Sequence, residues 1–398
     1  MNDIETKLLK LNELAIFKMS LGSKELFHSN FLEFIWDVNR EFFIRIVNLL
    51  IKNCGHTEEI VLQDNMHLGR EKLNFDLCLY TGEEDKPDNY IMIIENKVKS
   101  IPSKSQWDNY TKKIKQKNKP YFILLTLLNE FPDKKEIKEG HIWDICSYKE
   151  LKEAIKNNLE DVKDANTKMY IEDYCVFIGL MHELSSLIVP DTFKKQSLFP
   201  SEEIELFKKS RLHDLYIKLR GLSFLQELKH LIGEDKVMVS SFAGDKLRQK
   251  ILKHEEGFVP DKVYLNFAIY RSEGQVAAFV FNNKSPMGDI YEIVIQGVQY
   301  RHGINHYVED SYNKIEAQNK IWDEIHPNGK EFLCNNWKFG DNNIFPDKSS
   351  KGRNGAFLGY SNDYIYKYIK IANMSVKVLL DGMSKEILNL YREFYIVP

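Results

Sequence analysis

Two apolar segments of the sequence carry acidic residues where a buried strand would not be expected to hold them. The segment IIENKVKS (93–100) contains Glu95 and Lys97, and NFDLCLY (74–80) contains Asp76. In a β-strand, residues two apart point to the same face, so Glu95 and Lys97 share one. A carboxylate and an ammonium at the end of an apolar strand call for a chemical explanation.

A symmetric hairpin of these segments brings the two acids together. With residue 81 opposite residue 90, Asp76 stands opposite Glu95, about 4.5–5.5 Å away at Cβ. Two negative charges at that distance are unfavourable unless a positive charge lies between them. Carboxylate oxygens suit Mg²⁺ or Mn²⁺, and Lys97 adds a further positive charge. A register slip of one residue would break this arrangement.

A divalent cation held by two acids, with a lysine beside it, is suited to hydrolysis of a phosphodiester. The metal holds the phosphate, lowers the pKa of bound water and neutralises developing charge. Lysine orients or helps to deprotonate the attacking water. The pattern [DE]-x-K alone is not specific. It recurs in polar sequence at Glu84/Lys86, Asp133/Lys135 and Glu136/Lys138. The competing interpretation is an exposed strand end with a solvated salt bridge.

Four blocks of the chain, in order, resemble the PD-(D/E)xK nuclease superfamily, in the group with IENK and QxxxY motifs. The blocks are KELFHSNFLEFIWD (24–37), FDLCLY (75–80), IIENKVKS (93–100) and QWDNY (106–110). The resemblance implies a restriction-endonuclease-like core, cleavage of DNA with Mg²⁺ or Mn²⁺, and a catalytic set of Asp76, Glu95 and Lys97. Phe75 replaces the proline of the signature, which is often absent.

The resemblance also implies roles for residues of the first block. Glu25 would complete a metal shell with Asp76 and Glu95, and we expect the backbone carbonyl of Asn96 to join it. His28 would touch the scissile phosphate, with Ser29 beside it as a second nucleic-acid-binding residue. The alternatives are a solvated Glu25 and a His28 that bonds to the backbone.

The last block adds a pair on one helix face. Gln106 and Tyr110 are four residues apart, so they lie on the same side of a helix. By resemblance Gln106 joins the catalytic residues, and Tyr110 helps to position Lys97 or the nucleic-acid backbone. The alternative is an ordinary amphipathic helix.

Positive charge gathers around this block. Between Lys97 and Lys119 there are eight lysines and one acid, Asp108, in a chain whose net charge is −3. Phosphate binding needs such a patch, and salt weakens it. We therefore expect nucleic-acid contacts from Lys99, Lys104, Lys112 and Lys113. A solvated helix face is the competing interpretation.

Hydrophobic periodicity predicts the elements that position these residues. Residues 1–50 read as helices, and further helices are predicted at 103–117 and 167–188. Strands are predicted at 74–80, 90–98, 121–128 and 141–148. The fold class is therefore α/β: a mixed sheet flanked by helices in a nuclease-like domain, residues 1–190.

A second domain is predicted at residues 201–398, after a linker with two prolines. It reads as α+β with antiparallel strands at 263–271, 274–282 and 290–298. Helices are predicted at 202–232, 308–325 and 378–395, and the tyrosines around 360–368 either line a sheet or stack bases. We expect this accessory domain to select substrate, to dimerise or to receive a signal.

The length and composition of the chain limit the class of protein it can be. A chain of 398 residues is longer than one core usually supports. It has no apolar run of 18 residues and no signal-peptide pattern, so we expect no membrane contact. Its five cysteines form no CxxC, which argues against zinc and disulfides and favours the cytoplasm.

The expected partner is DNA, with RNA and a homodimer as open alternatives. A metal-dependent deoxyribonuclease, acting in defence against foreign DNA by family analogy, is the preferred function. A non-cleaving module that binds nucleic acid or protein on a nuclease fold is the main competitor. The presence of Asp76, Glu95 and Lys97 together argues against it.

Overall fold

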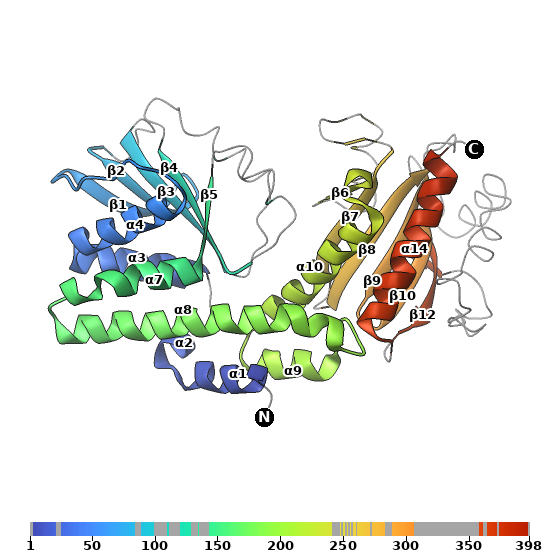
Figure 1. Ribbon diagram of the computed structural model, residues 1–398, viewed down its shortest axis with the longest axis horizontal. Helices are drawn as coiled ribbons and strands as arrows, with labels where there is room; N and C mark the ends of the chain where they lie inside the picture. The colour runs from blue at the N-terminus through green and yellow to red at the C-terminus, as the bar shows by residue number, and fades with distance from the viewer. Residues whose placement is uncertain are drawn as a thin grey trace. The chain divides into compact units, whose positions relative to one another are not determined.

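The computed structural model describes residues 3–20, 25–83, 89–98, 110, 120–128, 134, 143–240, 247, 250, 253, 255, 258–259, 261–270, 273–282, 289–305, 358–360, 364–371 and 374–396. The chain divides into two compact units, whose elements are labelled in Figure 1. Unit 1 comprises Met1–Val189 and Glu205–Leu219, and unit 2 comprises Pro190–Ile204 and Arg220–Pro398. These units differ from the predicted ranges, 1–190 and 201–398, mainly in that Glu205–Leu219 packs with unit 1.

Sheet A, the five-stranded sheet of the described part of unit 1, keeps its strands in chain order. Its strands are β1 (Met66–Lys72), β2 (Phe75–Thr81), β3 (Tyr90–Lys97), β4 (Tyr121–Thr126) and β5 (Asp144–Ser147). Neighbours from β1 to β3 are antiparallel, whereas β3, β4 and β5 run parallel. The predicted mixed sheet is confirmed. The sequence analysis misses β1 because MHLGREK lacks regular apolar alternation.

Helices cover one face of sheet A. The described helices of unit 1 before residue 190 are α1 (Asp3–Glu13), α2 (Ala15–Met19), α3 (Glu25–Val38), α4 (Arg40–Asn53), α7 (Tyr148–Asn158) and α8 (Ala165–Asp191), whose last residues enter unit 2. In Figure 1, α3, α4 and α7 lie together below the sheet. Helix α3 contacts β1, β2 and β3, and α4 packs on both α3 and α7. The predicted α/β class is therefore confirmed.

The start of α7 is fixed by a capping box. The Ser147 hydroxyl accepts a hydrogen bond from the Glu150 backbone N–H at 3.1 Å. The Glu150 carboxylate accepts one from the Ser147 backbone N–H at 2.6 Å. Because Ser147 also ends β5, this box holds the first turn of α7 at the edge of sheet A.

Helix α8 is long and apolar enough, by length and composition alone, to cross a membrane. Half of its most apolar window is buried inside the structure. Its buried residues include Tyr174, Phe177 and Ile178, which belong to the core of unit 1. A helix that is apolar over much of its surface and buried in a core has this same composition.

Sheet B, the seven-stranded sheet of the described part of unit 2, has the order β11-β12-β10-β9-β8-β7-β6. Its strands are β6 (Val237–Val239), β7 (Val263–Tyr270), β8 (Glu273–Asn282), β9 (Asp289–Gln296), β10 (Gln299–Asn305), β11 (Leu358–Tyr360) and β12 (Tyr364–Lys370). Neighbouring strands are antiparallel except β6 and β7. The predicted α+β class of this second part is confirmed, and the sheet extends beyond the three predicted strands on both sides.

Two helices pack on one face of sheet B, α10 (His213–Ile232) and α14 (Val376–Tyr395). Gly221 of α10 approaches β7 so closely that a Cβ there would lie 2.0 Å from the Phe267 ring. On α14, Phe394 packs against Tyr291 with ring centroids 4.8 Å apart. The predicted helix 202–232 is divided into α9 (Ser201–Lys209) and α10, and the predicted helix 308–325 lies outside the described residues.

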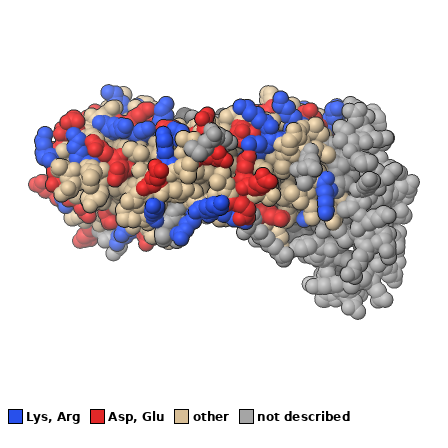
Figure 2. All heavy atoms as spheres, turned by 90° about the horizontal axis from the view of Figure 1, so that it is seen from below, with Lys and Arg blue, Asp and Glu red and all other residues tan. Residues whose placement is uncertain are grey.

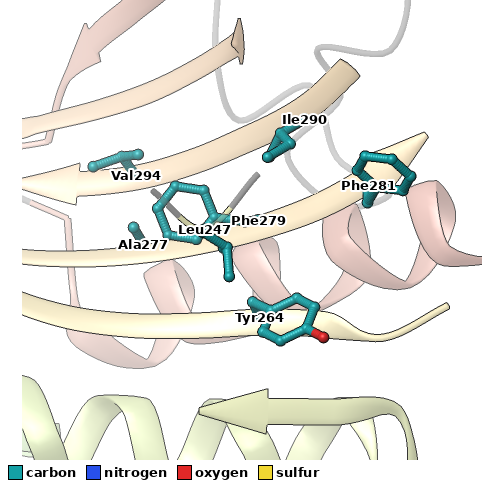
Figure 3. Packing of buried hydrophobic residues seen from close by; sticks show 7 residues of the cluster. All are labelled: Leu247, Tyr264, Ala277, Phe279, Phe281, Ile290 and Val294. Atoms are coloured by element: carbon teal, nitrogen blue, oxygen red, sulfur yellow. The ribbon is translucent and has the colours of Figure 1, made fainter. Parts of the chain in front are cut away.

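The opposite face of sheet B carries a separate apolar cluster, shown in Figure 3. Its members are Leu247, Tyr264, Ala277, Phe279, Phe281, Ile290 and Val294. The Tyr264 hydroxyl donates to the Val259 carbonyl at 2.8 Å, which satisfies its polar end. Sheet B is therefore buried on both faces around β7, β8 and β9.

A buried acid between α14 and β10 gives unit 2 a pH-dependent stability. Glu386 accepts a hydrogen bond from the Tyr300 hydroxyl, and a Glu386 carboxylate oxygen lies 3.5 Å from His302 Nδ1. Burial raises the pKa of Glu386 from 4.5 to about 8 and lowers that of His302 from 6.5 to about 4. Burial also raises the pKa of Tyr300 well above its ordinary value, so Tyr300 stays protonated in this range.

From these shifts we predict that the free energy of unfolding falls as pH rises from 6.5 to 8. Below pH 6.5 the folded state lacks a proton on His302 and holds one on Glu386, so the two effects oppose each other. Above 6.5, of these two groups only Glu386 acts, and it contributes a slope of up to about 1.4 kcal/mol per pH unit. Denaturant unfolding at pH 6.5 and 8 measures this slope, and Glu386→Gln should flatten it. An unchanged slope in that variant would contradict the prediction.

Candidate active site

The register of β2 and β3 places the two acids as the sequence predicts. Leu77 pairs with Ile94 and Cys78 with Ile93, the same register that sets residue 76 opposite residue 95. The predicted pair 81/90 is wrong, because the register shifts at Tyr80, which pairs with Tyr90. This irregularity lies at the far end of the hairpin and leaves the acidic end unchanged.

Beyond the last paired residues, the carboxylates replace the ladder hydrogen bonds. The Asn96 backbone N–H donates to Asp76 Oδ2 at 2.6 Å. The Asp76 backbone N–H donates to Glu95 Oε2 at 3.3 Å. Each acid thus accepts a hydrogen bond from a main-chain amide of the neighbouring strand. The exchange fixes Asp76 and Glu95 side by side where β2 and β3 stop pairing.

Lys97 and Tyr110 both bond to Glu95. Lys97 Nζ donates to Glu95 Oε1 at 2.6 Å, and the Tyr110 hydroxyl donates to the same oxygen at 3.3 Å. Glu95 is 2% and Lys97 6% exposed, so this is a buried ion pair. A buried charge needs a partner, and breaking such a pair leaves the other charge uncompensated. The structure therefore brings Asp76, Glu95, Lys97 and Tyr110 together.

The protonation states follow from burial and from the neighbouring charges. Burial raises the pKa of Asp76, against the Asn96 N–H and Lys97, which lower it. Burial raises the pKa of Glu95 to about 7, with Lys97 opposing and Asp76 adding to the rise. Burial would lower the pKa of Lys97, but the charge and hydrogen bond of Glu95 outweigh it and raise the pKa. Lys97 is therefore protonated at neutral pH, and its charge only partly offsets the burial that raises the pKa values of the two acids.

Glu25, the first residue of α3, acts on the same site. Its negative charge raises the pKa of both Asp76 and Lys97. It also acts on Lys218 of α10, whose pKa is lowered by burial while Asp214 and Glu25 raise it. Lys218 belongs to the segment Glu205–Leu219 of unit 1, and the sequence analysis misses it because it stands far along the chain.

His28 and Ser29 lie on the side of α3 that packs into the core. Both are 1% exposed on the buried side of α3. His28 Nδ1 is 3.0 Å from the Tyr174 hydroxyl, and its ring stacks on Phe177 at 5.5 Å. Ser29 Oγ accepts a hydrogen bond from Asn96. Both side chains point into the core in this structure, and their predicted contacts with nucleic acid stay predictions.

Several predicted residues lie outside the described part of the chain. They are the catalytic candidate Gln106 and the nucleic-acid-binding candidates Lys99, Lys104, Lys112 and Lys113. The predicted helix 103–117 falls in the same region, of which only Tyr110 is described. Their roles stay predictions.

The acids fit a divalent metal of the Mg²⁺ type. Among the described residues, no three His, Cys, Asp or Glu side chains form a metal-holding group. Mg²⁺ does not require one, because it keeps several waters and is held by one or two carboxylates plus substrate phosphates. Asp76 and Glu95 supply those carboxylates. Asp76 Oδ1 accepts no hydrogen bond from any residue described, which leaves this oxygen for a cation.

Tyr148 is a further residue that the sequence analysis misses. Its hydroxyl donates to Asn96 Oδ1 at 3.1 Å, directly behind the two acids. The available signal is the S-x-x-E pattern at 147–150, which predicts a helix start at Tyr148. That pattern places the element but does not show that Tyr148 reaches Asn96.

The comparisons with known proteins bear on this site. The family model of the PD-(D/E)XK nuclease superfamily matches residues 11–176. This range includes the three acids of the candidate site, Glu25, Asp76 and Glu95, and also Lys97. No curated protein and no solved structure shows a significant match to the chain. The match agrees with the mixed sheet and its flanking helices, and it confirms the predicted resemblance and the restriction-endonuclease-like fold class.

Proposed function

From the membership of residues 11–176 in the PD-(D/E)XK nuclease superfamily, we infer that this protein hydrolyses DNA phosphodiester bonds with Mg²⁺ or Mn²⁺. The observation that carries the proposal is the joint placement of Asp76, at the beginning of β2, with Glu95 and Lys97, at the end of β3. A half-buried acid, Asp76, and a buried one, Glu95, both with raised pKa values, lie beside one lysine and form a site that a divalent cation would complete.

Each residue has a role that its contacts support. Asp76 and Glu95 would hold the cation, with the Asn96 carbonyl and Glu25 as proposed additional ligands. When bound, the cation would supply charge neutralisation and a lowered pKa for its water. Lys97 is protonated at neutral pH, which suits it to orient water and stabilise phosphate charge. Its raised pKa does not favour the role of general base.

The choice of DNA rests on the superfamily and on local charge. On the face in Figure 2, lysines and arginines are interspersed with acids over the described residues. The charge for phosphate binding would then come from the lysines between 97 and 119, close in sequence to the catalytic strand. Defence against foreign DNA and a cytoplasmic location are part of the proposal. Family analogy supports the first, and the absence of a CxxC pattern supports the second.

Cleavage assays with Lys97→Ala test the proposal. Plasmid DNA, linear DNA and RNA are incubated with wild type and variant in Mg²⁺, Mn²⁺ or EDTA. We expect metal-dependent cleavage of DNA by wild type and a loss of at least about 10²-fold in the variant. Lys149→Ala, which changes an exposed lysine of α7, should keep wild-type activity.

The outcomes separate the competing functions. Cleavage that persists in Lys97→Ala would place the chemistry elsewhere or in a contaminant. Binding of DNA by wild type without cleavage in either metal would favour the non-cleaving module. Faster cleavage of RNA than of DNA would keep the nuclease and correct its substrate.

A further inference from the structure

Asn96 carries a fully buried side-chain amide between two charged residues. It is 0% exposed, and as the middle residue of Glu95-Asn96-Lys97 its side chain points to the opposite face of β3. A buried amide is costly unless its donors and acceptor are satisfied. Asn96 Nδ2 donates to Ser29 Oγ at 2.8 Å, and Oδ1 accepts from the Tyr148 hydroxyl at 3.1 Å. The amide is therefore held from two helices, α3 and α7.

The backbone of this same residue belongs to the candidate active site. Its N–H donates to Asp76 Oδ2 at 2.6 Å, beyond the last residue pair that joins β2 to β3. On its other side β3 is paired with β4, with Asn96 beside Leu125 and Lys97 beside Thr126. A turn of the Asn96 peptide would move Asp76, Glu95 and Lys97 together. The side-chain amide of Asn96 thus ties the orientation of the site to the two helices behind it.

The position of Tyr148 is fixed by its helix and by packing. It is the first residue of α7, directly after Ser147, the N-cap of the Ser147–Glu150 capping box. Its ring packs against His28 at 5.0 Å, and it is 1% exposed. Burial raises its pKa well above the ordinary value, and Glu25 and Asp76 add to the rise. The hydroxyl therefore keeps its proton and remains a donor to Asn96.

We propose that Tyr148 is a positioning residue of the active site, which acts with Ser29 through the Asn96 side chain to hold Asp76, Glu95 and Lys97 in metal-binding geometry. This inference rests on the proposed nuclease function. It also gives Ser29 a different role from the predicted contact with nucleic acid. Residues that orient metal ligands from behind typically change metal affinity or activity by about 10–100-fold when they are altered.

The test is Tyr148→Phe, which removes only the hydroxyl. Mn²⁺ is titrated by calorimetry into protein without nucleic acid, and cleavage of linear DNA gives kcat and KM. We expect Mn²⁺ affinity and kcat each to fall by about 10-fold or more, with KM for DNA changing less than about threefold. Ser29→Ala removes the second bond to the same amide and should act in the same direction. If Tyr148→Phe does not fold, the Mn²⁺ affinity and kcat of Ser29→Ala still test the proposal.

Tyr174→Phe is the matched control. It removes another buried hydroxyl of unit 1, one that bonds to His28 rather than to Asn96. We expect it to leave Mn²⁺ affinity within about twofold of wild type. Equal losses in Tyr148→Phe and Tyr174→Phe would mean general weakening of the core and would overturn the proposal. Wild-type affinity and kcat in folded Tyr148→Phe would overturn it as well, with the nuclease function intact.

The two levels of inference separate in the wild-type protein. If wild type neither binds Mn²⁺ nor cleaves DNA, the proposed function fails, and the positioning role fails with it. If wild type binds and cleaves, only the comparison of variants decides the role of Tyr148.

Discussion

Asp76→Asn is expected to abolish metal-dependent cleavage while leaving the fold intact. The change keeps the shape of the side chain and an oxygen for the Asn96 N–H, but removes one of the two charges that would hold the cation. We expect kcat to fall by about 10³-fold. The Asp76 charge raises the pKa of Glu95, so its loss also removes an unfavourable repulsion. Without metal the variant should therefore be at least as stable as wild type.

A cleavage assay measures kcat, and thermal unfolding with and without Mn²⁺ measures the stability and the loss of metal binding. A ligand that binds only the folded state at about 100 times its Kd stabilises it by about 2.7 kcal/mol. Wild type should therefore gain stability with Mn²⁺, and Asp76→Asn should not. Asp64→Asn, the same change at an exposed position of unit 1, should respond like wild type. A full response to Mn²⁺ in Asp76→Asn would show that the metal lies elsewhere.

Arg220→Ala is expected to destabilise unit 2 by about 3–5 kcal/mol, because buried carbonyls lose the hydrogen bonds that a charged group donates to them. Arg220 is 0% exposed, and its guanidinium donates hydrogen bonds to backbone carbonyls of the segment that follows α8. Nε donates to the Leu198 carbonyl at 2.6 Å, and Nη2 donates to the Ser197 and Thr192 carbonyls at 2.9 and 3.3 Å. Nη1 lies 3.6 Å from the Asp191 carboxylate. Removal of the guanidinium leaves the buried carbonyls without this donor, whereas Asp191 keeps its ion pair with Lys195 at 3.3 Å.

Denaturant unfolding of the full chain checks this value. Arg392→Ala, an exposed arginine of α14 in the same unit, should cost little and serves as the control. A loss below about 1 kcal/mol in Arg220→Ala would mean that water replaces the guanidinium at these carbonyls. The contacts of Arg220 also show that the segment predicted as a linker is packed in unit 2. Its residues 191–198 are held by a buried arginine, although two prolines and the lack of a period suggest a loose connection.

Features that depend on neighbouring residues were readable from the sequence. The apolar runs of β2, β3 and β4 predict strands because a buried strand needs such a run. The period of two places Glu95 and Lys97 on one face, and a symmetric hairpin sets Asp76 opposite Glu95. The four blocks in order resemble the superfamily, and its family model matches residues 11–176. The catalytic roles of these residues remain predictions for the experiments above.

Features that depend on partners distant in sequence required the tertiary structure. Spacing allows His28 and Ser29 to face either solvent or core, and packing against Phe177 and Asn96 decides for the core. Tyr148 bonds to Asn96 only because α7 begins directly where β5 ends. Lys218 joins unit 1 because Glu205–Leu219 packs there. Sequence periodicity fixes which way a side chain points within its own element, whereas the residue it meets depends on how the elements pack.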